Sequence, residues 1–162
     1  MSEKPTPEQA LAELKEQIRS VLLSTLGEDG NPHTGYTPFI FDGRDLIIFV
    51  SQLSLHTRDL LANAKASAML IADESTSSQI FARTRVSYQC NAVVIAPHEE
   101  HYAILLEAMQ ARHGKIMDLL KGLPDFVLFR LQPSAGQFVM GFGQAFHLHG
   151  DNFDEFEHAT SA

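Results

Sequence analysis

The chain has little cysteine, no tryptophan and no long apolar run, and these shortages exclude several classes of protein. Cys90 is the only cysteine among the 162 residues, so no disulfide can form within the chain. No uninterrupted apolar segment reaches the roughly 20 residues that a membrane-spanning helix needs. The opening segment, MSEKPTPEQA, is polar where a signal peptide would be apolar. These features predict a cytoplasmic protein that does not bind membranes.

Positive charge is also scarce. Lys and Arg total 12 against 20 Asp and Glu, which gives a net charge of −8 at pH 7, and no run of basic residues occurs. This balance argues against nucleic acid and anionic membranes as partners, because proteins bind both mainly through positive charge. No Walker-type glycine loop is present, and Gly-Phe-Gly at residues 141–143 lacks the third glycine and the following helix of a dinucleotide-binding fingerprint.

The length is that of one domain, and we expect a single domain over residues 1–162. Its N-terminal helix should fall within residues 1–19, with Thr6 as N-cap, Pro7 in the first helical position and Gln9 completing a capping box. Residues 150–162 form an acidic tail that we expect to be poorly ordered.

Short apolar runs alternate with turn-forming residues along the rest of the chain, which is typical of an antiparallel sheet. Strands are expected at residues 21–26, 33–41, 46–50, 66–71, 80–96, 126–131, 137–140 and 145–149. The turn-forming residues at 27–31 should join the first two strands as a hairpin, with a further turn at 133–136 and helices after Ser54 and Pro97. Pro38 cannot donate to a sheet, so its strand should be an edge or a bulged strand, and Gly35 allows close approach of a flat group or of another backbone. The many short strands favour closure into a small barrel.

The helix after Ser54 joins two strongly apolar strands. Ser54 suits an N-cap, and His56, Thr57 and Arg58 follow where free backbone N–H groups and the helix dipole favour an anion. This arrangement predicts a phosphate or carboxylate site. The alternative is that Ser54 only caps the helix, while Arg58 is solvated and His56 is a surface residue.

Two further groups of residues leave alternatives open. Arg83 and Arg85 would share one face of the strand at residues 80–96, either as a solvated basic face or as ligands for phosphate or propionate groups. His147 and His149 share a strand face, but no carboxylate or third ligand accompanies them as a specific zinc site requires. Cys90 lies within a strand and is interpreted as a buried, inert thiol.

Four blocks, read in order, carry a family resemblance. They are HTRDLLAN at residues 56–63, QIFARTR at 79–85, DFVLFRLQP at 125–133 and GQFVMGFGQA at 136–145. Together they resemble the haem-iron-utilisation branch of the pyridoxamine-5'-phosphate-oxidase-like, FMN-binding split-barrel superfamily, over residues 15–158. The resemblance implies a mainly β fold with flanking helices, a six-stranded antiparallel split β-barrel. It also implies an intimate homodimer with two equivalent cofactor sites at its interface.

The resemblance further implies where a cofactor would bind. In flavin-binding relatives the FMN phosphate lies near the counterparts of Ser51, His56, Thr57 and Arg58, and the ring lies beside those of Tyr36, Thr37 and Pro38. The counterparts of Gln79, Arg83 and Arg85 complete the pocket, partly from across the interface.

In haem-degrading relatives the same interface takes haem, and a tail histidine bonded to an aspartate matching Asp125 holds the iron. The family's Gly-His pair lies several residues beyond His158 and is missing here, so only His158, His147 or His149 could substitute. We therefore expect an FMN-binding, flavin-dependent oxidoreductase without an assigned catalytic residue. Haem binding or breakdown in iron acquisition is the alternative, and a non-catalytic cofactor carrier is a third.

Overall fold

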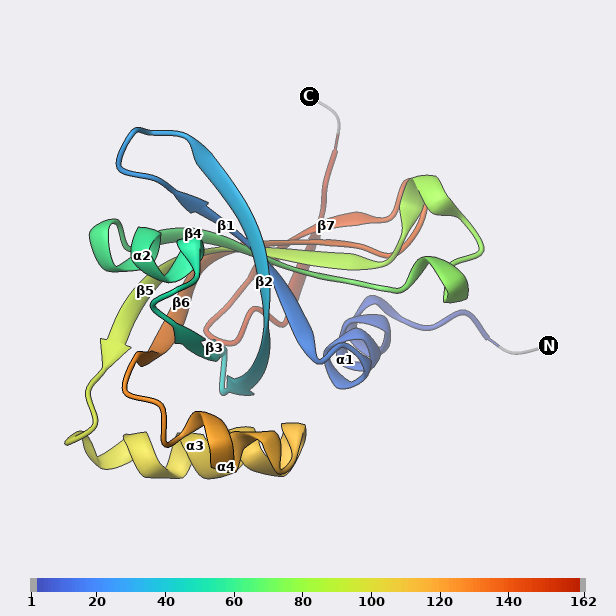
Figure 1. Cartoon of the computed structure of the whole chain (residues 1–162). Coiled ribbons are helices and arrows are strands. Elements are labelled where there is room, and N and C mark those ends of the chain that lie inside the picture. Colours follow the sequence, from blue (N-terminus) through green and yellow to red (C-terminus); the bar gives the residue numbers. More distant parts are fainter. Residues whose placement is uncertain (1–2, 161–162) are drawn as a thin grey trace.

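The computed structural model describes residues 3–160, which form an eight-stranded antiparallel sheet that curls into a barrel (Figure 1). Six strands close the barrel in the order β3-β2-β1-β4-β5-β6, because β6 pairs back onto β3. β7 and β8 extend the sheet beyond β6. The expected six-stranded antiparallel split barrel is confirmed. The strands are β1 (Ser20–Leu26), β2 (Pro32–Asp42), β3 (Asp45–Ser51), β4 (Lys65–Ile71), β5 (Arg85–Ile95), β6 (Phe126–Val139), β7 (Ala145–His149) and β8 (Glu155–His158).

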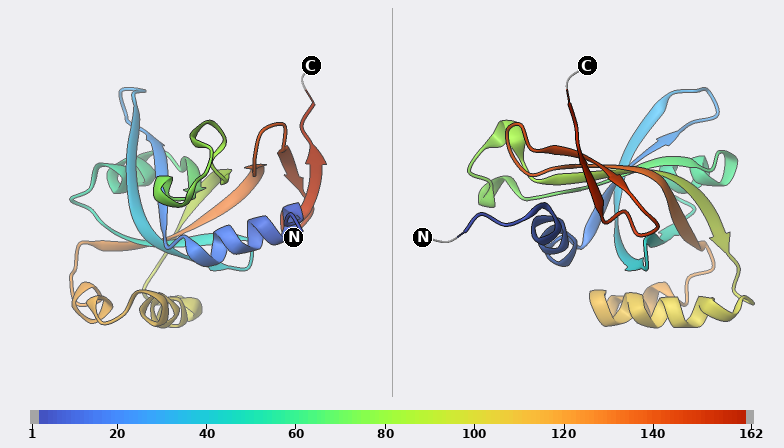
Figure 2. Two further views of the ribbon diagram at one scale, coloured as in Figure 1. Left: turned by 90° about the vertical axis from the view of Figure 1, so that its right-hand side faces the viewer. Right: turned by 180° about the vertical axis from the view of Figure 1, so that it is seen from behind.

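In the described residues four α-helices flank the barrel: α1 (Pro7–Gln17), α2 (Leu55–Ala62), α3 (Glu100–His113) and α4 (Ile116–Leu120). The predicted capping box of α1 is present, since Thr6 Oγ1 accepts from the Gln9 backbone and the Gln9 side chain accepts from the Thr6 backbone. α3 and α4 lie side by side below the barrel in every view (Figure 2). No helix within residues 3–160 combines the length and the apolar character needed to cross a membrane.

Two apolar clusters explain why the run at residues 46–50 is continuously hydrophobic. Leu46 and Ile48 belong to the cluster inside the barrel, whereas Ile47 and Phe49 belong to a second cluster together with residues of α3 and α4. Successive residues of a strand face opposite sides of a sheet, so both faces of β3 are buried.

Pro38 lies where β2 changes partner. β2 pairs with β1 up to Pro38 and with β3 from Phe39 onward. The next backbone donor after the proline, Phe39 N, bonds Arg19 O at 3.2 Å. β2 therefore lies between β1 and β3 in the strand order, and the expected edge or bulge is corrected to a change of partner.

The predicted turn at residues 133–136 is wrong, because β6 runs through it. Gln89 pairs with Ala135 and Cys90 with Pro133, so Ser134 is an extra residue opposite this point, a β-bulge. Its hydroxyl donates to Gln89 O at 3.3 Å. A bulge bends a strand and increases its twist, which suits β6 because its first half closes the barrel on β3 and its second half carries β7.

Two other expectations are corrected. The long strand at residues 80–96 is replaced by a 3-10 turn at Ile80–Ala82 followed by β5. The tail beyond residue 150 was expected to be poorly ordered, but β8 pairs with β7. Arg44 stabilises the turn between β7 and β8. Its guanidinium donates to Asp151 O at 2.9 Å, and its Cζ atom lies 4.6 Å from the centroid of the Phe153 ring. Residues 161–162 of the tail lie outside the described residues.

Candidate functional site

The start of α2 presents backbone N–H groups that an anion could bind. Ser54 is the N-cap with extended geometry, but its side chain makes no capping hydrogen bond, which corrects its expected role. The first backbone N–H groups of the helix therefore donate no hydrogen bond to the Ser54 side chain. Arg58 is exposed in the same helix, and its guanidinium donates to Leu53 O at 3.2 Å. A cation and free N–H groups thus come together as the sequence predicts.

His56 and Thr57 point into the protein rather than out beside Arg58. The His56 ring packs against Gly35, where a Cβ atom would lie 2.7 Å from His56 Nδ1, so the flat group that approaches Gly35 is this imidazole. Burial lowers the pKa of His56, and the charge of Asp59 only partly opposes this effect. His56 Nε2 and Thr57 Oγ1 are buried and have no hydrogen-bond partner among the described residues.

Ser51 and Asp125 meet at the turn that leads into α2. Ser51 ends β3, Asp125 directly precedes β6, and the Ser51 hydroxyl donates to the Asp125 carboxylate. Asp125 O also accepts from Gln52 N at 2.8 Å, and Ser51 Oγ accepts from Leu53 N at 3.1 Å. Two hydrogen bonds therefore hold the chain entering α2 to the residue before β6, a third lies within the turn itself, and Asp125 is partly buried there.

The three predicted residues of β2 divide between its two faces. Tyr36 is 68% exposed and lies on the outer face of the sheet with Pro38, whereas Thr37 is buried and its hydroxyl donates to Pro38 O. His56 packs over Gly35, whose partner Leu23 belongs to the barrel core. Within one chain, Tyr36 and His56 therefore lie on opposite faces of the same strand.

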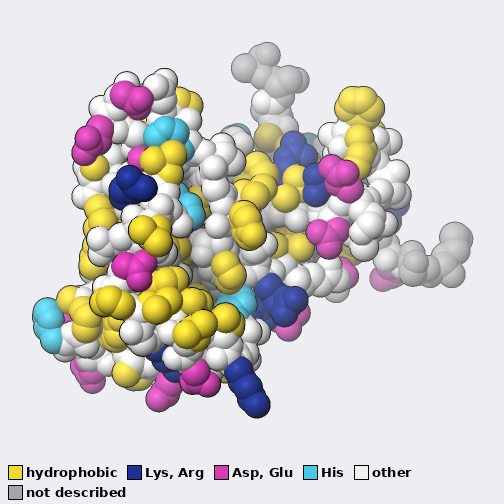
Figure 3. All heavy atoms as spheres, viewed as in Figure 1, with side chains coloured by type: hydrophobic (Ala, Val, Ile, Leu, Met, Phe, Trp, Pro, Cys, Tyr) yellow, Lys and Arg dark blue, Asp and Glu magenta, His cyan; other side chains and the backbone are white. Residues whose placement is uncertain are grey.

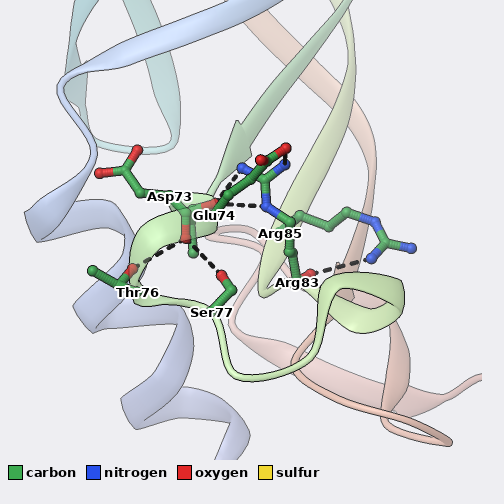
Figure 4. A network of polar contacts seen from close by, with 7 residues as sticks. Asp73, Glu74, Thr76, Ser77, Arg83 and Arg85 are labelled. Atoms are coloured by element: carbon green, nitrogen blue, oxygen red, sulfur yellow. Dashed lines mark hydrogen bonds and ion pairs between the residues drawn. The ribbon is translucent and has the colours of Figure 1, made fainter.

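Gln79 and Arg83 lie in the loop between β4 and β5, and Arg85 is the first residue of β5. Their hydrogen bonds stay within this segment, and Figure 4 shows those of Arg83 and Arg85. Arg83 Nε donates to Ala72 O at 2.9 Å, and its terminal nitrogen lies 3.5 Å from Glu74. Arg85 donates to Arg83 O at 3.1 Å, and the Gln79 side chain accepts from Phe81 N. No hydrogen bond in residues 3–160 joins this group to α2, so the structure does not unite the two halves of the predicted pocket within one chain.

His158 and Asp125 also lie apart. His158 is on β8, opposite Phe146, and its ring centroid is 5.1 Å from that of Phe146. The strand that carries β8, β7, pairs with Gly136–Val139 at the end of β6. Asp125 lies at the other end of β6, directly before its first residue. His149 bonds Glu157 at 2.5 Å on the same hairpin. Within residues 3–160, no three His, Cys, Asp or Glu side chains are arranged to hold a metal ion.

Cys90 is buried, as predicted. Burial, together with the charge of Asp45, raises the pKa of the Cys90 thiol to about 12. A thiol in this state is protonated at neutral pH and is a poor nucleophile.

A pocket of about 400 Å³ opens where α2 meets the turn between β1 and β2. Arg58 and Leu55 line it from the helix, and His33 lines it from β2. The surface beside it is apolar, because Leu53 is 82% and Leu55 50% exposed, and Figure 3 shows further hydrophobic side chains over α3 and α4. Sequence analysis missed His33 and its buried partner Asp59. The only available signal was the expected hairpin, which sets His33 opposite Thr25.

The pyridoxamine 5'-phosphate oxidase family matches residues 7–140 of this chain. The chain belongs to this family. It is 35% identical over 151 residues to HutZ of Vibrio cholerae, which is named a haem oxygenase, and the match covers 93% of this chain and 86% of HutZ. It is 31% identical to HOZ of Arabidopsis thaliana, named a non-canonical, chloroplastic haem oxygenase, over 81% of this chain and 41% of HOZ.

Solved structures of this family share the fold. The crystal structure of HutZ from Vibrio cholerae, described as a haem storage protein, superposes with a TM-score of 0.77 at 31% identity, covering 80% of this chain and 92% of HutZ. ChuZ of Campylobacter jejuni superposes with a TM-score of 0.83 at 25% identity over 97% of this chain and 64% of ChuZ. The expected membership of the haem-utilisation branch is therefore confirmed.

Proposed function

We propose that this chain binds haem in the pocket at the start of α2 and serves haem utilisation. The observation that carries the proposal is the 35% identity, over 93% of the chain, to a protein named a haem oxygenase. The sequence alone favours FMN and offers haem as the alternative. The relatives named after haem support that alternative better than FMN.

Three residues at the start of α2 suit a flat apolar ligand that carries carboxylates, namely Arg58 and Leu55, which line the pocket, and Leu53 beside it. The Arg58 guanidinium uses one of its nitrogens on Leu53 O, so its other N–H groups can bind a carboxylate in a bidentate manner. Leu53 and Leu55 present apolar side chains next to it, as expected for a site that packs against a macrocycle. His56 Nε2 and Thr57 Oγ1 are buried and have no hydrogen-bond partner among the described residues, so each would bond to a water or a ligand group that reached it.

Bound haem would supply redox-active iron for oxygen chemistry. The chain itself would bind a propionate through Arg58 and keep water from one edge of the macrocycle through Leu53 and Leu55. Ser51 and Asp125 would keep the turn before α2 in place.

Hemin titration of the full chain tests the proposal. We expect a Soret band that saturates, and weaker binding for Arg58→Ala by about tenfold to a hundredfold, because a charge-assisted hydrogen bond contributes roughly 1.5–3 kcal/mol. Lys115→Ala is the control, since Lys115 is an exposed cation next to α4, on another part of the molecule. Equal binding by the two variants would contradict a role for Arg58, and no Soret band would overturn haem binding.

Storage and breakdown are separated by adding ascorbate to the hemin complex. Loss of the Soret band with formation of an open-chain tetrapyrrole would mark breakdown, and a stable Soret band would mark storage. FMN is tested in the same way by quenching of its fluorescence. Tight FMN binding without hemin binding would restore the flavin hypothesis, which the helix start and Arg58 also suit because both favour phosphate.

The family resemblance implies a homodimer, and we further propose that the two copies pair through the outer face of the sheet. One outward-facing row crosses seven strands, because Leu22 pairs with Tyr36 and Met69, and the register continues through Ser87, Gln137, His147 and Glu157. Leu22 is 42% and Tyr36 68% exposed, and a hollow of about 520 Å³ borders the row at β1, β4 and β5. A partner on this face would let Tyr36 and Arg85 of one chain face the other chain.

Light scattering after size exclusion measures this association. We expect twice the chain mass of 18.0 kDa for the wild type and the mass of one chain for Leu22→Asp. Ile104→Asp, on the exposed side of α3, should leave the mass unchanged. A wild-type mass of one chain would overturn the proposal.

A further inference from the structure

A groove of about 650 Å³ lies between α1 and α3, and β2 forms its floor. Six of its nine lining residues are apolar, namely Phe39, Ile40 and Phe41 of β2 and Ala12, Ala108 and Ala111 of the two helices. The three alanines are exposed and have small side chains, so they leave space between the helices. The volume falls within the range of about 300–1,000 Å³ that is typical of small-molecule sites.

The ammonium group of Lys15 lies in this groove beside an aromatic ring. Lys15 Nζ is 4.8 Å from the centroid of the Phe41 ring. It forms no ion pair and no hydrogen bond with any residue between positions 3 and 160. The side chain is partly buried, and burial lowers the pKa of Lys15 more than the charge of Asp154 raises it. A cation in this position is stabilised when an anion comes close.

Arg112 adds a second cation from the opposite side of the groove. Arg112 Nη2 donates to Glu16 O at 2.7 Å, so the guanidinium links α3 to the end of α1. Its Nη1 and Nε groups donate to no residue in the described part of the chain. The exposed Glu16 is the one carboxylate among the lining residues, so two cations and one anion give the groove a charge of +1 in a chain of −8. Figure 3 shows Lys and Arg side chains between α1 and the helices α3 and α4.

Apolar floor and positive charge together select one kind of ligand. A neutral apolar ligand would bury Lys15 further without pairing its charge, and a cationic ligand would meet two like charges. A compact anion such as phosphate would pair with Lys15 but leave the apolar floor in water. A single carboxylate on an apolar body covers the floor and pairs with the ammonium at the same time.

We propose that this groove binds an amphipathic monocarboxylate of the fatty-acid class, with its chain on Phe39–Phe41 and its carboxylate on Lys15. The groove is separate from the pocket at the start of α2, because His33 lies near one end of β2 and Phe39–Phe41 near the other. The inference therefore goes beyond the proposed function and stands without it.

Calorimetric titration of the full chain with octanoate, below the concentration at which octanoate forms micelles, tests the charge recognition. We expect saturable binding to one site, weakened about tenfold or more in Lys15→Gln, because a charge-assisted hydrogen bond to the carboxylate is lost. Lys15→Arg should keep most of the affinity, since it keeps the cation. Octan-1-ol has a similar chain without the charge and should bind the wild type about tenfold more weakly or worse than octanoate. Lys115→Gln, which removes an exposed cation next to α4, is the control and should bind as the wild type does.

A second pair of variants tests the location. Ala108→Phe places a ring in the groove from an exposed position, so it should abolish octanoate binding and leave the fold intact. Ala103→Phe, exposed on α3 outside the groove, should bind octanoate as the wild type does. A wild type that binds no octanoate would overturn the proposal, and so would equal binding by the wild type, Lys15→Gln and Ala108→Phe. Circular dichroism checks each fold, and if Lys15→Gln does not fold, Ala108→Phe and the comparison with octan-1-ol still decide.

Discussion

Thr25 on β1 donates a hydrogen bond of 2.8 Å from its hydroxyl to the carboxylate of Asp59 on α2. The two residues are 34 positions apart in the chain, and both are almost completely buried. Because water cannot easily replace either partner, the bond helps to hold α2 against the barrel. Arg58 precedes Asp59 directly, so the position of the proposed haem site depends on the same contact.

Thr25→Val should lower the free energy of unfolding by about 1 kcal/mol, because the valine keeps the shape but removes one hydrogen bond to Asp59. Urea denaturation measures the change. Thr34→Val is the matched control, since Thr34 is exposed on the neighbouring strand, and its effect should stay within about 0.5 kcal/mol. Equal losses for the two variants would show that the bond contributes nothing specific.

Acid should weaken the wild-type protein partly through Asp59. The pKa of this carboxyl is raised by burial and lowered more strongly by its hydrogen bonds, so it ends below its ordinary value of 3.8. The folded protein therefore holds this proton less tightly than the unfolded chain. The contribution to stability is complete above pH 3.8 and is lost as the pH falls through the folded-state pKa. Urea denaturation over this range should show a smaller acid dependence for Asp59→Asn than for the wild type.

Gly35→Ala should destabilise the fold by about 1–3 kcal/mol, because the new Cβ atom would press against the buried ring of His56. Thermal or urea unfolding measures this. Gly122→Ala serves as the comparison, because its Cβ atom would meet Leu119 O at 3.5 Å, an ordinary contact, and should be nearly neutral. If Gly35→Ala were as well tolerated, the ring could not be held against this backbone.

His56 should titrate below its ordinary pKa of 6.5, since burial disfavours the charged ring more than the Asp59 carboxylate favours it. The folded protein then takes up this proton less readily than the unfolded chain, so the stabilising contribution of the neutral ring falls as the pH drops below 6.5. An NMR titration of the ring gives the midpoint. In Asp59→Asn the midpoint should drop further, because the favourable charge is gone; an upward shift would contradict this account.

Local patterns predicted the elements well where short-range physics decides them. Thr6 and Gln9 form their capping box within one helical turn, and the turn-forming residues at 27–31 join two strands as expected. The resemblance of four sequence blocks predicted the split barrel, and the family match confirms it. The same local rules failed at residues 133–136, because a bulge opposite β5 absorbs the turn-forming residues into β6.

The candidate site was predicted only in part. Arg58 and the start of α2 are placed as the sequence suggests, but Thr57 is a core residue and Tyr36 lies on the opposite face of the sheet from His56. Successive residues of a strand point to opposite faces of the sheet, so the sequence predicts which residues share a face. It does not predict which of the two faces a later helix will cover. Gln79, Arg83 and Arg85 lie at the far end of β4. That they complete the pocket from a second copy of the chain remains a prediction.

By itself, the sequence determined most of the strands and helices, the family, and the cation at the start of α2, because these depend on neighbouring residues and on motif blocks. Only the tertiary structure decided that α2 covers the β1–β2 hairpin, which brings Asp59 to Thr25 and His33 over 34 and 26 positions of the chain. The contact between α2 and the hairpin buries that carboxylate, and a buried carboxylate needs hydrogen-bond donors, which Thr25 and His33 supply.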